Sequence, residues 1–318
     1  MFFNTMMMAS AEAIHQFLVE SGMASGDIPT EQWFDHPSEE SNNFEGYAVA
    51  VSGDGLTAVI GAPYDSSQVT NGGRVTIWEY QSGTWTYVRP ISLDTADRSI
   101  RDYLGWSVDI SYDGSVIVVG AENSRHGGTT GTRTGVAYVF ERPSGGWSTL
   151  TASTAAGAKL RANLANTFIV QEFGYSVAVS GDGNTVVVGA PNTINVVSWR
   201  YGLVYLFEKP SGGWVDTYED HKLYQYNDTT GDDLGWAVDI SYDGSVVVAG
   251  MPFYDVTNGT DNGAVIVFEK GNGWAGGPTN YADILLAKDL NASQNNEWFG
   301  PSVAISADGN VIVVGAYN

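Results

Sequence analysis

The chain has 318 residues and no cysteine, so no disulfide can support its fold. Its formal charge of −22 comes from 36 acidic against 14 basic residues. This charge argues against nucleic acid and anionic membranes as partners, because both require positively charged patches. The 39 glycines and 39 aromatic residues (17 Tyr, 12 Phe, 10 Trp) suit a domain with many turns and a large aromatic core.

Residues 1–43 lie outside the pattern that fills the rest of the chain. The first eight residues are apolar, but they are too short to span a bilayer and no basic residue precedes them as in a signal peptide. Residues 9–21 predict a helix with Ile14, Phe17 and Leu18 on one face. We expect this N-terminal arm either to cap the domain or to dock on another subunit.

Residues 44–318 contain one motif five times, beginning near residues 44, 104, 173, 234 and 299. Each copy opens with an aromatic residue or leucine next to a glycine. An alternating strand follows and turns at Asp-Gly, because these residues tolerate the positive φ of a tight hairpin. The turn glycines, Gly55, Gly114, Gly183, Gly244 and Gly309, are 59 to 69 residues apart. Repeats of this length, built from short strands, predict an array of small sheets.

The second half of each repeat predicts two more strands. A β-branched strand ends at Gly-Ala or Gly-Met, a glycine introduces a third strand, and a tryptophan after the next turn starts a fourth. Four strands in a meander predict an all-β fold, a β-propeller with four full repeats plus a half repeat. A stacked solenoid is the alternative, although its repeats are usually shorter. We interpret the recurring tryptophans as packing residues between blades and not as a carbohydrate platform: Trp85, Trp147, Trp214 and Trp274.

A second period of two blades overlies the first. Repeats two and four share Leu-Gly-Trp-x-Val-Asp-Ile-Ser-Tyr-Asp-Gly-Ser, which indicates that the array grew by copying pairs of blades. This pattern places Asp109 and Asp239 where the other repeats have Ala50, Ala178 and Ala304. We expect both carboxylates to face a neighbouring blade or the central channel. There they either accept hydrogen bonds from backbone amides or hold a channel cation, since a buried unpaired carboxylate is too costly.

The fifth repeat supplies strands at 299–305 and 311–316 but no third strand before residue 318. A two-stranded sheet is marginal in water and presents a bare edge. Three explanations stay open: the N-terminal segment 32–35 completes this blade, a partner chain does, or the sequence is part of a longer array.

Phe173-Gly174 followed by Gly189-Ala190-Pro191 resembles the FG-GAP repeat, the blade of the integrin α-subunit propeller. The resemblance covers about residues 44–318 and is closest in the first and third repeats. It implies a propeller used for extracellular adhesion or assembly and no identified reaction. It also implies that partners bind on the face that carries the long connections.

One departure from the family concerns calcium. Members often carry an Asp-x-Asp-x-Asp-Gly calcium loop, whereas this chain has Ser-x-Asp-Gly with a single carboxylate. Calcium needs six to eight oxygen ligands, so we interpret these aspartates as turn formers and expect no calcium there. Other polar connections could still hold an ion. The histidines show no zinc spacing, and neither a cysteine nucleophile nor a Gly-x-Ser-x-Gly elbow is present. The chain is therefore predicted not to be an enzyme.

Strand parity places the long, variable connections on one face of the propeller. Within the repeats they are residues 63–73, 121–134, 190–201 and 251–262, which we call the long-loop face. Variable loops on a rigid scaffold are where binding usually resides. We predict a non-catalytic extracellular or cell-surface adhesion module with a protein or glycan partner on this face. The alternative is a structural subunit of a surface filament or virus particle, which would self-assemble through the N-terminal arm and the half repeat.

Three N-glycosylation sequons, at Asn227, Asn258 and Asn291, fall in predicted connections where a glycan could be accommodated. Their number is what chance predicts, so it gives no evidence of secretion.

Overall fold

The computed structural model describes residues 43–91, 99–126, 132–150, 157–163, 168–169, 172–195, 202–224, 231–255, 261–271, 273–274, 281–286 and 298–317. The predicted helix at 9–21, the segment 32–35 and the sequons at Asn227, Asn258 and Asn291 lie outside these residues. In the described part, strands account for almost all regular structure, and the 3-10 helix η2 (Trp147–Thr149) is a short exception. No helix in this part has the length and apolarity to cross a membrane.

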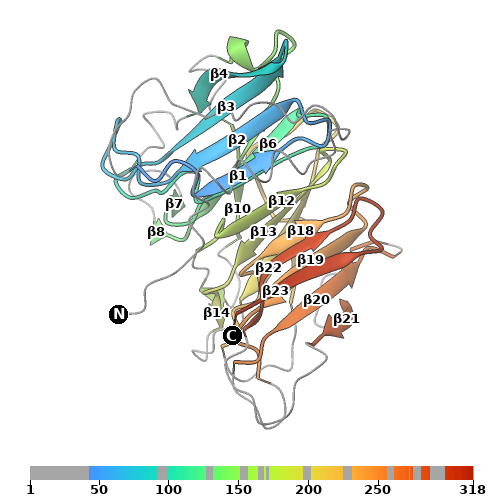
Figure 1. The fold of residues 1–318 in the computed structure, drawn as a ribbon. Helices are drawn as coiled ribbons and strands as arrows, with labels where there is room; N and C mark the ends of the chain where they lie inside the picture. Colours follow the sequence, from blue (N-terminus) through green and yellow to red (C-terminus); the bar gives the residue numbers. More distant parts are fainter. Residues whose placement is uncertain are drawn as a thin grey trace.

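Each sequence repeat forms one sheet, and the sheets follow one another in chain order (Figure 1). Blade 1 contains β1 (Ala48–Val51), β2 (Thr57–Ala62), β3 (Arg74–Gln81) and β4 (Thr84–Ile91). Blade 2 contains β5 (Ser107–Ile110), β6 (Val116–Ala121), β9 (Val136–Glu141) and β10 (Ala158–Arg161). Blade 3 contains β12 (Ser176–Val179), β13 (Thr185–Ala190), β15 (Leu203–Glu208) and β17 (His221–Leu223). Blade 4 contains β18 (Val238–Ile240), β19 (Val246–Met251), β20 (Ala264–Glu269) and β21 (Tyr281–Leu285). The half blade contains β22 (Phe299–Ile305) and β23 (Ile312–Ala316).

Short strands lie outside these blades or extend them: β7 (Arg125–His126), β8 (Thr132–Arg133), β11 (Phe168–Ile169), β14 (Ile194–Asn195) and β16 (Thr217–Tyr218). Strand β16 comes from blade 3 but pairs in parallel with β10, so it adds a fifth strand to the sheet of blade 2. Arg161 on β10 and Asp216 beside β16 form an ion pair of 3.0 Å at this junction. The outer edges of blades 2 and 3 are thereby joined.

The first strands of consecutive blades contact one another: β1 with β5, β5 with β12, β12 with β18, and β18 with β22. These strands therefore lie nearest the axis, and each meander runs outward from them. This arrangement confirms the predicted β-propeller of four full repeats and a half repeat. Sequential antiparallel pairing also puts all Asp-Gly hairpins at one end, which we call the tight-turn end, and the β2–β3 type of connection at the other.

The cores lie between the blades. On β6, Ile117 and Val119 pack toward blade 1, whereas Val116 and Val118 pack toward blade 3. The second strand of each full blade is thus buried on both sides. A strand in that position reads as a continuous apolar run, which is why these segments are so rich in valine.

The two halves of the repeated motif meet across each blade interface. A Cβ atom on Gly120 would lie 2.0 Å from the carbonyl oxygen of Gly174 in the next blade, and one on Gly189 would lie 2.0 Å from that of Gly235. The same close approach occurs from Gly61 to Gly105 at 2.2 Å and from Gly250 to Gly300 at 1.8 Å. Only glycine fits, because real Cβ contacts never come so close. The glycine next to the end of one second strand is therefore matched to the glycine that opens the next repeat.

One sequence prediction about the strands is wrong. The tryptophan starts the fourth strand only in blade 1, where Trp85 belongs to β4. In blade 2, Trp147 lies in η2 and the fourth strand begins at Ala158. In blades 3 and 4 the fourth strands likewise begin after Trp214 and Trp274. The reason is that these indoles turn inward and are buried instead of alternating along a strand.

Replacing Gly189 by alanine should destabilise the propeller. The new methyl would press on the backbone of Gly235, and overpacking of this kind typically lowers the free energy of unfolding by about 1–3 kcal/mol. Gly212→Ala is the matched control, because a Cβ there meets no atom within 4 Å. Chemical denaturation of both variants measures the effect. Equal stability of the two variants would show that the glycine contact between blades is not required.

Candidate functional site: the two ends of the propeller

The tight-turn end is built from five copies of one hydrogen-bonded turn. In the half blade, Ser306 Oγ donates to Asp308 Oδ1 at 2.6 Å, and the backbone N–H of Asn310 donates to the same oxygen at 3.1 Å. The N–H of Val311 donates to Ser306 Oγ at 2.9 Å. The same bonds recur around Asp54, Asp113, Asp182 and Asp243. Hydrogen bonds from Ser306 and Asn310 lower the pKa of Asp308 to about 2.

These contacts explain the single aspartate of each turn without an ion. The carboxylate organises the hairpin, which is the turn-forming role that the sequence suggested. Among the described residues, no group of three or more His, Cys, Asp or Glu side chains could hold a metal ion.

The recurring tryptophans fasten the turns to the blades. Trp147 is fully buried, and its indole N–H donates to the carbonyl of Gly114 at 3.1 Å. Trp214 makes the same bond to Gly183 at 3.2 Å. Both rings lie in the core shared with the preceding blade. Trp85 of blade 1 is only half-buried.

Trp214→Ala should cost about 3–5 kcal/mol of unfolding free energy, because it removes a buried ring and leaves the Gly183 carbonyl without its indole donor. Trp85→Ala should cost clearly less, since that ring is half-buried. Thermal and chemical denaturation of both variants provide the comparison. Loss of sugar binding with no change in stability would overturn the packing interpretation.

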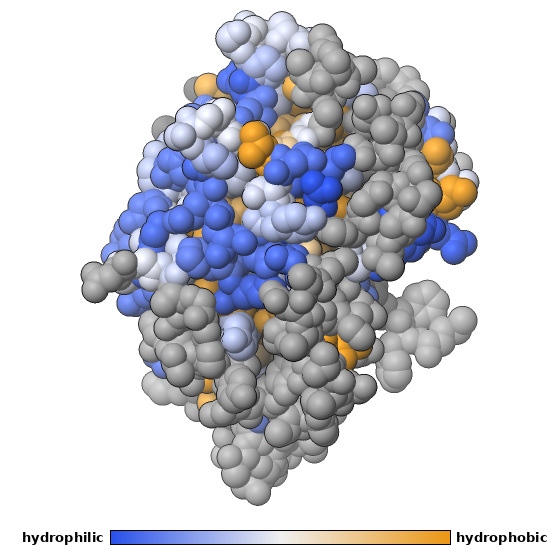
Figure 2. All heavy atoms as spheres, turned by 180° about the vertical axis from the view of Figure 1, so that it is seen from behind, coloured by the Kyte–Doolittle hydropathy of each residue, from blue (hydrophilic) through white to orange (hydrophobic). Residues whose placement is uncertain are grey.

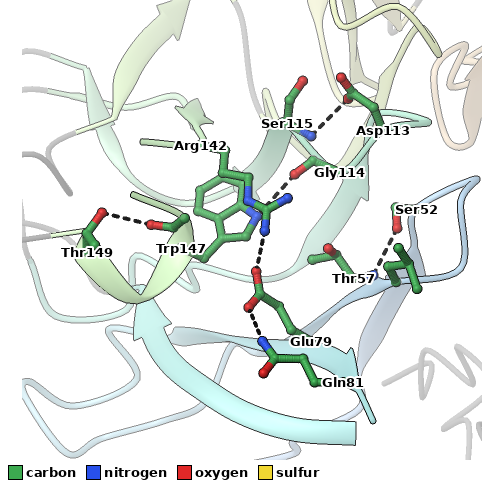
Figure 3. A network of polar contacts seen from close by, with 12 residues as sticks. Ser52, Thr57, Glu79, Gln81, Asp113, Gly114, Ser115, Arg142, Trp147 and Thr149 are labelled. Atoms are coloured by element: carbon green, nitrogen blue, oxygen red, sulfur yellow. Dashed lines mark hydrogen bonds and ion pairs between the residues drawn. The ribbon is translucent and has the colours of Figure 1, made fainter. Parts of the chain in front are cut away.

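A row of ion pairs links the third strands of consecutive blades. The pairs are Arg142 with Glu79 at 2.7 Å, Lys209 with Glu141 at 2.8 Å, and Lys270 with Glu208 at 2.7 Å. In each pair the acid lies at or near the end of the third strand of one blade, and the cation directly follows the third strand of the next. Figure 3 shows Arg142 reaching Glu79, near the bond from Trp147 to Gly114. Such exposed pairs contribute at most about 1 kcal/mol each to the free energy of unfolding. They join equivalent positions of consecutive blades but add little to the stability.

Asp109 and Asp239 lie between blades. The Oδ2 atom of Asp109 accepts the backbone N–H of Val179 in blade 3 at 2.7 Å, and that of Asp239 accepts the N–H of Ile305 in the half blade at 2.7 Å. Burial, reinforced by the charge of Asp239, raises the pKa of Asp109 to about 7. Burial also raises the pKa of Asp239. The two carboxylates thus act as acceptors for first-strand amides of the following blade.

The raised pKa of Asp109 predicts a pH-dependent stability. The folded state holds a proton here that the unfolded chain releases near its ordinary pKa of 3.8. The resulting stabilisation is complete below that value and is lost as the pH rises through about 7. Between about pH 5.5 and about pH 8, the free energy of unfolding of the wild type should therefore fall by about 1–2 kcal/mol more than that of Asp109→Asn. Groups other than this aspartate titrate in both proteins, so their effect cancels in the comparison. Stability curves that run parallel for the wild type and the variant would contradict the raised pKa of this aspartate.

The long-loop face carries a continuous row of aromatic side chains, which we call the aromatic row. Its members are Tyr47, Trp106, Tyr175, Trp236, Phe253 and Trp298, with successive ring centroids 4.8, 5.8, 5.0, 5.4 and 5.3 Å apart. The first four residues directly follow the glycine that opens the repeat in blades 1 to 4; we call this glycine the motif glycine. Phe253 belongs to the loop 251–262, and Tyr64 of the loop 63–73 lies 6.3 Å from Tyr47. The row therefore crosses all five repeats beneath the long loops, with Trp106 and Tyr175 buried and its other members half-buried.

Two carboxylates accompany this row. Glu122 stands where three other repeats have proline, and burial together with the charge of Glu172 raises its pKa to about 7. Burial raises the pKa of Tyr47, and the charge of Glu122 adds to this shift. Burial raises the pKa of Tyr64 as well, and the charges of Tyr103 and Glu122 add to this shift. The site is thus aromatic and carries the negative charge of Glu172, to which that of Glu122 is added above about pH 7.

The backbone at this end is strained in every repeat. The residue two positions before each motif glycine has a left-handed conformation, although none is a glycine: Phe44 (φ 53°), Tyr103 (57°), Glu172 (57°), Asp233 (55°) and Trp298 (39°). Such conformations are uncommon for side chains of this size and cluster at binding sites. The strained segment is held by the preceding repeat, for example through the N–H of Leu104, which donates to the Gly72 carbonyl of blade 1 at 3.1 Å.

Buried polar contacts also hold the loops themselves. In the loop 63–73, Asp65 is 2% exposed and pairs with Arg74 at 3.3 Å. In the loop 121–134, Arg133 lies 3.9 Å from the buried Asp102 and donates to the carbonyl of Asn123 at 2.8 Å. The described parts of the long-loop face are therefore a preformed surface.

The sequence predicted where the long connections lie but did not predict the aromatic row. Of the four predicted loops, 63–73 is described in full, and 121–134, 190–201 and 251–262 are described in part. The signal for the row was present, because an aromatic residue follows the motif glycine in four repeats.

A comparison with protein families supports the motif. The family model of the FG-GAP repeat matches residues 92–140, which include the glycines at both ends of the motif in blade 2, Gly105 and Gly120. The chain therefore contains an FG-GAP repeat, and the same geometry recurs in its other blades. A specific relationship to integrin α subunits stays a prediction. Comparison with the curated proteins found no match.

Proposed function

We propose that this FG-GAP repeat protein is a non-catalytic adhesion or binding module that acts outside the cell, with its partner on the long-loop face. The observation that carries the proposal is the aromatic row, which spans five repeats on the face where the variable loops lie. Tight hairpins occupy the opposite end, where hydrogen bonds within each turn use the polar groups. The asymmetry between the two ends favours one binding face.

The chemistry of the aromatic row indicates what it would bind. Aromatic faces attract cations and stack on apolar faces of sugars. Glu122 and Glu172 add negative charge, and the chain as a whole carries −22. Figure 2 shows that the described surface seen from behind is mainly hydrophilic with separate apolar patches, as expected of a domain in aqueous surroundings. A basic segment of a partner protein fits these features better than a neutral glycan.

The binding face can be tested with arrays of immobilised basic peptides and neutral glycans. We expect binding to basic peptides that weakens with salt and falls about tenfold or more in Trp236→Ala. Tyr218→Ala is the control, because this aromatic residue is 47% exposed outside the row. Wild-type affinity should rise with pH through about 7 as Glu122 ionises, and Glu122→Gln should lose most of this dependence. The proposal would be overturned if Tyr218→Ala abolished binding while Trp236→Ala bound like the wild type.

A further inference from the structure

The half blade exposes a surface that is buried in every other blade. We call the side of a blade that faces the next repeat its downstream face and the opposite side its upstream face. Val311 and Val313 on the downstream face of the half blade are 58% and 64% exposed. The equivalent pair in blade 2, Val116 and Val118, is 2% and 0% exposed because blade 3 covers it.

Two further residues of the half blade match the parts of an interface between blades. Gly315 corresponds to Gly120 and Gly189, which touch the motif glycine of the following blade. The three atoms nearest to a Cβ on Gly315 all belong to Ser302 of the same blade. Ser302 is exposed and corresponds to Ser107, whose hydroxyl donates to the Gly174 carbonyl of the next blade at 2.9 Å. The half blade is therefore shaped to receive another FG-GAP blade.

The residue at the hairpin tip restricts which blade fits. A Cβ atom on Gly53 of blade 1 would lie 2.0 Å from the ring of Tyr112 in blade 2. A blade with tyrosine at its hairpin tip therefore requires glycine at the tip of the preceding blade. The half blade has Ala307 at this position, which leaves no room for a tyrosine. The following blade must carry a small tip residue. Blade 1, with Gly53, and blade 3, with Gly181, satisfy this condition, but the upstream face of blade 3 already packs on blade 2.

Blade 1 has the complementary features. Its upstream face is an apolar cluster in which Val49 and Val51 are half-buried, and no blade precedes it in the described chain.

We propose that the downstream face of the half blade binds the upstream face of blade 1 in a second copy of the chain. Copies would then associate head to tail, which gives a ring if the rotation closes and a filament if it does not. This association makes the chain an assembling subunit. It uses neither the aromatic row nor the long loops, so it stands or falls independently of the proposed binding function.

Sedimentation of the full chain over a wide concentration range tests the proposal. The wild type should gain mass with concentration, and Val313→Asp should weaken association about tenfold or more by burying a charge. Gly315→Ala should do the same, because a methyl blocks the approach of the next blade, whereas the nearest atom that it meets within one copy is the rotatable hydroxyl oxygen of Ser302. Val215→Asp, at a site 51% exposed elsewhere, is the matched control and should associate like the wild type.

A mixing experiment tests the head-to-tail geometry. Val313→Asp and Val49→Asp each damage one face and leave the other intact, so neither should associate alone but their mixture should form a one-to-one dimer. Unchanged melting temperatures verify that the variants are folded. A wild type that stays monomeric throughout, or downstream variants that associate like the wild type, would overturn the proposal.

Discussion

The close approach of glycine backbones between consecutive blades is the contact on which the rest of the structure depends. It fixes the separation of the second strand of one blade from the first strand of the next at four interfaces, with virtual Cβ distances of 1.8 to 2.2 Å. At that separation the β-branched side chains on both faces of each second strand interlock, and the buried cores lie between blades and not within them. The two glycines of the motif therefore form one interface, to which each of two consecutive repeats contributes one glycine.

The two ends of the propeller differ in the contacts that their side chains make. At the tight-turn end, serine hydroxyls, aspartates, indole N–H groups and ion pairs are used for the turns and for the order of the blades. At the long-loop face the backbone is strained, Glu122 has a raised pKa, and the aromatic rings form a row that crosses the blades. Such a face is suited to recognition because the interfaces below it are rigid.

Much of the fold could be predicted from the sequence because its determinants are local and repeated: Asp-Gly turns, alternating strands and paired glycines. Properties that depend on contacts between repeats were harder to predict. The parallel pairing of β16 with β10 has no local signal, since it joins residues of different blades. The inward turn of Trp147 into η2 depends on the Gly114 carbonyl of the neighbouring hairpin. The two-blade period was visible as a pattern, but its physical reason, Tyr112 over Gly53 and Tyr242 over Gly181, required the structure.

Native-state hydrogen exchange of a dilute, monomeric sample tests most directly whether the interfaces between blades hold the fold. Amides are protected in proportion to the free energy of local opening. The second strands β2, β6, β13 and β19, each covered by a following blade, should exchange slowly, and residues 311–316 of the half blade should exchange markedly faster. Equal protection of 311–316 and the other four second strands would contradict the account, because strand pairing alone would then suffice without the glycine contact to a next blade.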